Sequence, residues 1–196
     1  MQITLLHYCL TSKRKRFSRR NQHEQKYHSM ARKSLTITLY MSELIYDFQN
    51  KAFLTGRSRR AADMDAEAAS NIQASDDDED KNQALRSIQN AYSQLLVELS
   101  ESVRTDSGTT ASNELIDGDT NITINLSLPS NYPLALKDAL TSSIHDYIIN
   151  KALMDWFIIT NPNESKTYSE LSVVAIKNLH ETINRRERPS RTAPNE

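Results

Sequence analysis

The sequence predicts a mainly α-helical protein: a small bundle of four to five helices with one β-strand or hairpin and a disordered basic N-terminal tail. The chain has only three glycines in 196 residues, whereas sandwiches and barrels with many tight turns need more. Apolar residues recur three or four positions apart in four segments, as on a helix with one buried face. A single strong segment alternates apolar and polar residues as a β-strand does.

The N-terminal part differs from the rest in charge. Residues 1–40 contain nine of the 24 Lys and Arg but one of the 25 acidic residues. We therefore expect a separate tail over residues 1–38 on an acidic body. Three interpretations stay open: a nucleic-acid-binding arm, an inert disordered tail, or translated sequence upstream of a start at Met30 or Met41. Its apolar run precedes the charges, unlike a secretion signal, and is too short to cross a bilayer.

The body, residues 39–188, is predicted to begin with two helices. The first covers Leu39–Leu54 and ends at Gly56, because glycine commonly terminates helices. A weakly held helix is expected after it. The acidic run 75–80 suits a solvated linker or the start of the next helix, whose apolar stripe is Leu85, Ile88, Tyr92, Leu95 and Leu99. The polar segment near 104–120 is predicted to be a flexible loop.

The predicted strand follows that loop. Ile122, Ile124, Leu126 and Leu128 alternate with polar residues, and Pro129 stops the pattern. A single strand leaves its edges unpaired. Its partner is either the segment 114–117 or a neighbouring subunit, so Ile122, Ile124 and Leu126 are candidate interface residues.

The long helix that Pro133 opens is unusually apolar in its second half. There Lys151 and Asp155 form one thin polar stripe, and the helix contains Trp156 and Phe157. Such a helix must be covered by its own bundle or by another copy of the protein. Trp156 and Phe157 are therefore interpreted as core or interface residues, and they are included among the candidate interface residues.

The last helix is predicted from about Ser165 to Arg188, with residues 189–196 frayed after Pro189. Arg185, Arg186 and Arg188 crowd its C-terminal end. Cations there offset the helix dipole, which we favour over contact with nucleic acid because the rest of the body is acidic. The three arginines complete the set of candidate partner-interface residues.

No catalytic, cofactor-binding or metal-binding residue is predicted. The lone Cys9 excludes an internal disulfide framework and a cysteine zinc cluster. His145 and His180 each lack a second ligand at helical spacing and are interpreted as surface or satisfied histidines. With no glycine-rich phosphate loop or nucleophile elbow, we expect a non-enzymatic protein without a cofactor.

The order of elements from Asn121 onward carries a family resemblance. A strand ending in "LSLPSNYP", a long helix "LKDALTSSIHDYIINKALMDWF" and a final helix ending in "LHETINRRERP" resemble structural proteins of tailed phages and prophages that are similar to head–tail connector (adaptor or head-completion) proteins. The resemblance covers about the last 75 residues.

The resemblance implies a virion protein that assembles in the host bacterial cytoplasm. Such a protein forms a homo-oligomeric ring, docks to portal or tail proteins and lies close to DNA without sequence specificity. No membrane association is expected. The alternative function is a nucleic-acid-binding accessory protein that uses the basic N-terminal arm.

Overall fold

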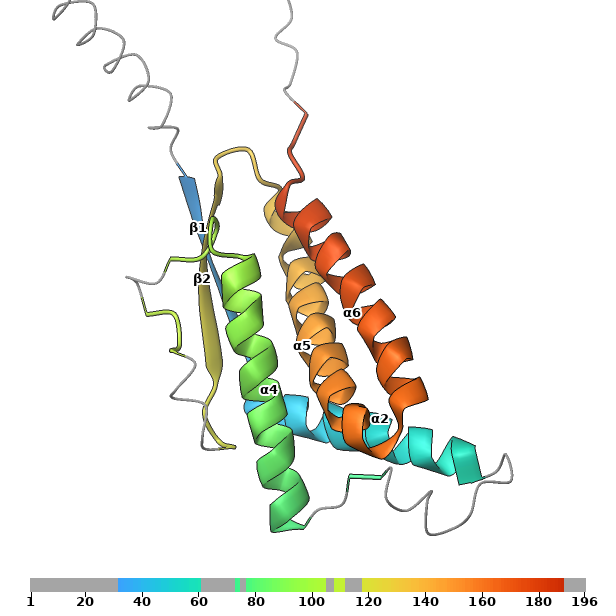
Figure 1. Ribbon diagram of the computed structural model, residues 1–196. Helices are drawn as coiled ribbons and strands as arrows, with labels where there is room; N and C mark the ends of the chain where they lie inside the picture. Colours follow the sequence, from blue (N-terminus) through green and yellow to red (C-terminus); the bar gives the residue numbers. More distant parts are fainter. Residues whose placement is uncertain (1–31, 61–72, 75–76, 105–107, 112–117, 189–196) are drawn as a thin grey trace, which may run out of the picture.

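The computed structural model describes residues 32–60, 73–74, 77–104, 108–111 and 118–188. This part of the chain is mainly helical, with one pair of antiparallel strands, which confirms the predicted fold class. Figure 1 shows α5 between α4 and α6, the strand pair beside α4, and α2 crossing one end of the bundle. The elements are β1 (Arg32–Leu39), α2 (Met41–Arg60), α4 (Asp78–Glu98), β2 (Ile122–Pro129), the 3-10 helix η2 (Leu134–Leu136), α5 (Lys137–Thr160) and α6 (Pro162–Ile183).

Strand β1 corrects the predicted boundary of the N-terminal tail. The charge distribution places residues 32–38 in the tail, but Arg32–Leu39 pairs with β2 from Arg32 opposite Pro129 to Leu39 opposite Ile122. This is a third partner for β2, in place of the segment 114–117 or a neighbouring subunit. Residues 1–31 and 114–117 lie outside the described residues. The pairing is favourable because β1 buries its alternate apolar residues Leu35, Ile37 and Leu39.

The second edge of β2 is also hydrogen-bonded. The N–H of Arg104 donates to the carbonyl of Asn125 over 2.8 Å, and the N–H of Ser127 donates to the carbonyl of Ser102 over 2.7 Å. Thr110 likewise donates its N–H to the carbonyl of Thr123 over 2.8 Å. The backbone groups of Thr123, Asn125 and Ser127 therefore point away from β1, and those of the even-numbered residues of β2 point toward it.

The aromatic residues in the apolar half of α5 are covered by their own chain. The Trp156 side chain is 8% exposed and its ring meets Phe48 of α2 edge to face, with 5.8 Å between the ring centroids. Phe157 is fully buried and stacks on Tyr168 of α6 at 5.2 Å. The sequence left open whether the bundle or another copy of the protein covers this part of the helix. The bundle itself covers the Trp156 and Phe157 rings.

Three predicted helix boundaries differ from the structure. Helix α2 continues through Gly56 to Arg60, and Gly56 is buried inside it instead of ending it. Helix α6 begins at Pro162, because the Asn161 side chain accepts hydrogen bonds from the N–H groups of Asn163 and Glu164 at 3.2 and 3.5 Å. It ends at Ile183, so the three arginines follow the helix.

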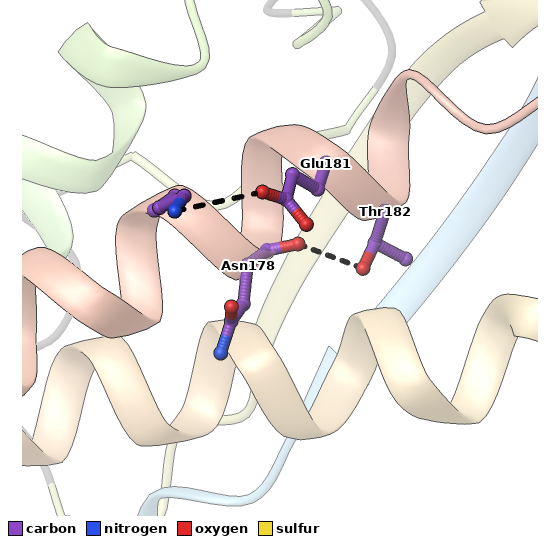
Figure 2. A network of polar contacts seen from close by, with 4 residues as sticks. Asn178, Glu181 and Thr182 are labelled. Carbon is purple, nitrogen blue, oxygen red and sulfur yellow. Dashed lines mark hydrogen bonds and ion pairs between the residues drawn. The ribbon is translucent and has the colours of Figure 1, made fainter.

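Polar side chains lie along the solvent-facing side of α6 (Figure 2). The Thr182 hydroxyl donates to the Asn178 carbonyl over 2.8 Å, and the Lys177 Nζ lies 4.0 Å from the Glu181 carboxylate.

The start of α4 is acidic as predicted, with Asp78 and Asp80 in its first turn. Acidic residues there are favourable because they oppose the positive end of the helix dipole.

Tyr132, in the connection between β2 and η2, is fully buried, and its hydroxyl has no hydrogen-bond partner among the described residues. Burial raises the pKa of this hydroxyl above its usual value of 10.0. We expect Tyr132→Phe to raise the free energy of unfolding by about 1–3 kcal/mol, because an unsatisfied buried polar group is removed. Urea denaturation measures the change.

Tyr92 provides the matched control for this prediction. It is equally buried, but its hydroxyl donates to the carbonyl of Thr110 over 2.7 Å. Tyr92→Phe should therefore lower the free energy of unfolding. Equal effects of the two substitutions would contradict the assignment of the Tyr132 hydroxyl as unsatisfied.

Candidate interaction surfaces

Most of the predicted interface residues lie in the core of the single chain. Ile122, Ile124, Leu126 and Phe157 are fully buried and Trp156 is 8% exposed. Elements β1, α2, α4 and α6 of the same chain cover these side chains, so no partner is needed to bury them. The sequence pattern correctly identified these side chains as buried, but it did not show whether the same chain or a partner buries them.

The three predicted arginines are exposed and form part of a larger basic cluster. Lys33 Nζ donates to the carbonyl of Tyr132 over 2.9 Å, and the N–H of Glu187 donates to the carbonyl of the adjacent Asn131 over 2.8 Å. The start of β1 and the segment after α6 thus both contact the connection between β2 and η2 and lie at the same end of the molecule (Figure 1). We call this cluster the basic end; its members are Arg32, Lys33, Arg185, Arg186 and Arg188.

The arginines of the basic end differ in their contacts. Arg186 Nη1 donates to the carbonyls of Ile183 at 2.9 Å and Arg185 at 2.8 Å, so it satisfies acceptors at the end of α6. Arg32, Arg185 and Arg188 are exposed, and within the described ranges no carboxylate forms an ion pair with them. Glu187 is the acidic residue within this segment.

The outer edge of β1 is a second surface, which the sequence pattern does not predict. Because the even-numbered residues of β2 face β1, the backbone groups of Ser34, Thr36 and Thr38 point to the opposite side. Nothing in the described part of the chain pairs with that side of β1. We call Ser34, Thr36 and Thr38 the open edge. Their side chains are exposed, and the Thr36 hydroxyl donates to Asn125 Oδ1 over 2.6 Å.

The polar stripe of α5 lines a small cleft against α4. The cleft has a volume of about 230 Å³, below the roughly 300 Å³ at which small-molecule sites begin. Lys151 and Asp155 line it with Ser87, whose hydroxyl donates to Asp155 Oδ2 over 2.9 Å. This hydrogen bond gives the Asp155 carboxylate on α5 a donor from α4, so the polar stripe helps to join the two helices.

The two histidines of the body face acidic side chains. His145 Nε2 lies 3.3 Å from Asp47 Oδ2 and joins α5 to α2, while His180 Nε2 lies 4.0 Å from Glu98 Oε2. Over the described ranges, no three His, Cys, Asp or Glu residues are grouped closely enough to hold a metal ion. No helix in the described residues is long and apolar enough to span a bilayer.

No family model, curated protein or solved structure matches this chain. The basic end and the open edge are therefore the features from which a function is inferred.

Proposed function

We propose that this protein is a non-enzymatic structural subunit that self-associates through the open edge of β1. The unpaired backbone of this edge carries the proposal. An exposed strand edge presents N–H and C=O groups that a further strand can pair with. Two antiparallel copies of β1 would join two strand pairs into one sheet of four strands in the order β2, β1, β1 and β2.

The open edge suits a second copy of the same strand. In a two-fold pairing centred on Thr36, this residue lies opposite its own copy and Ser34 lies opposite Thr38. Small hydroxyl-bearing residues form favourable cross-strand pairs. The same register places Arg32 opposite Tyr40, a half-exposed aromatic residue, so the cation meets a ring and avoids a second cation. The charges at the start of β1 are thus compatible with homotypic pairing.

The proposed biological setting is the virion of a tailed phage, as a component of the head–tail connector type. The order of strand, long apolar helix and final helix that carries the resemblance corresponds to β2, α5 and α6. In this setting the subunit is made in the host bacterial cytoplasm, oligomerises and docks to portal or tail proteins. Pairing through β1 makes a dimer the building unit and leaves the outer sides of α4 and α6 for those partners.

Substitution of Thr36 tests the proposal. Thr36→Pro removes an outward N–H from β1, and proline is tolerated on the free side of an edge strand. We expect this variant to be a folded monomer, whereas the unchanged protein is a dimer at tens of micromolar concentration. Light scattering coupled to size-exclusion chromatography measures the mass, and circular dichroism checks the fold.

Thr36→Val is the matched control. It loses the same hydroxyl bond to Asn125 but keeps the backbone N–H, so it should remain a dimer. A monomeric unchanged protein, or a Thr36→Pro variant that keeps its dimeric mass, would refute the proposed self-association.

A further inference from the structure

We infer that the basic end binds the phosphate backbone of duplex DNA, as an activity separate from self-association. Four of its five cations are arginines. The planar guanidinium group donates two parallel hydrogen bonds to a phosphate, which a lysine ammonium group does not do. The three arginines without an ion pair, Arg32, Arg185 and Arg188, are the groups available for these contacts.

The fold holds these cations together before any ligand arrives. The hydrogen bonds from Lys33 to Tyr132 and from Glu187 to Asn131 attach both basic segments to the same turn. Arg186 adds its two carbonyl contacts, which hold the segment after α6 against the helix end. The backbone of two basic segments from distant parts of the sequence is thereby held at one end of the molecule, which reduces the backbone entropy lost on binding.

The charge distribution favours a defined orientation on DNA. The acidic first turn of α4, with Asp78, Glu79 and Asp80, lies at the opposite end of the molecule from the basic end (Figure 1). A polyanion repels that end and attracts the other, so the protein approaches DNA with the basic end forward. Lipid-binding basic surfaces usually accompany an apolar helix face that inserts between headgroups. The basic end instead consists of a strand start and a segment after a helix, so we assign duplex DNA as the ligand.

The salt dependence of binding tests the inference. The full chain is titrated into a fluorescein-labelled 20-base-pair duplex, and anisotropy is recorded between 50 and 200 mM NaCl. Each phosphate contact contributes about 0.9 to the slope of log affinity against log salt. Arg185→Gln combined with Arg188→Gln should reduce the slope by about 1.8, so the unchanged protein loses about tenfold more affinity than the variant across this range.

Lys81→Gln combined with Arg86→Gln is the matched control, since it removes two exposed cations from α4. It should leave the slope unchanged. If both pairs lower the salt slope equally, the effect comes from net charge alone. If the arginine pair leaves the slope unchanged, these arginines do not contact DNA and binding is assigned to residues 1–31. Binding to phosphatidylserine vesicles without binding to the duplex would assign the surface to membranes. Each of these outcomes overturns the inference, and the unchanged mass of the arginine variant separates it from self-association.

Discussion

A chain that begins at Met41 should lose its cooperative unfolding transition, whereas a chain that begins at Met30 should keep it. The shorter chain lacks all of β1, including Leu35, Ile37 and Leu39, which are 6%, 0% and 4% exposed. Burial of each such side chain contributes about 1.5–3 kcal/mol, and typical domains are stable by only about 5–15 kcal/mol. Loss of three of them, together with the hydrogen bonds to β2, is comparable with the whole stability.

Thermal unfolding followed by circular dichroism distinguishes the two chains. A point substitution in the full chain gives the same information without truncation: Ile37→Ala should lower the free energy of unfolding by about 2–5 kcal/mol, whereas Thr38→Ala, on the exposed side of β1, should have little effect. Equal melting temperatures for the chains starting at Met30 and Met41 would show that β1 is not part of the folded unit.

The elements that sequence reasoning identified are those with long, regular patterns. Helix α4 and strand β2 each repeat apolar residues at one period over many positions, and burial follows that period. Helix α5 was identified by its first half, where Leu140, Ile144 and Tyr147 recur at helical spacing, and by its length. Strand β1 has the same alternation as β2, but over three apolar residues only. It adjoins a strongly basic segment, so the composition of residues 1–40 outweighed the local pattern.

The interaction surfaces were less predictable because they depend on contacts between distant residues. An apolar helix face must be buried, but the sequence of the helix does not identify the residues that pack against it. The partners of Trp156 and Phe157 turn out to be Phe48, far earlier in the chain, and Tyr168 on the next helix. The basic end has the same origin, since the segments that contain Arg32 and Arg185 lie at one end of the molecule because each contacts the turn at residues 131 and 132.

Phe157→Ala should lower the free energy of unfolding by about 3–5 kcal/mol. The Phe157 ring is fully buried and stacks on Tyr168, so its removal leaves a cavity between α5 and α6. The change is measured by urea denaturation at two protein concentrations. Because the ring is buried within one chain, the loss of stability should be the same at both.

Ile159→Ala is the control on the same helix. Its side chain is 84% exposed, so the substitution should change stability by less than about 0.5 kcal/mol. The interface interpretation of the apolar helix makes the opposite prediction for Phe157→Ala: the oligomer would dissociate while each subunit stayed equally stable. A folded, monomeric Phe157→Ala variant of unchanged stability would therefore contradict burial within one chain. It would support the interpretation that the Trp156 region is a contact between copies.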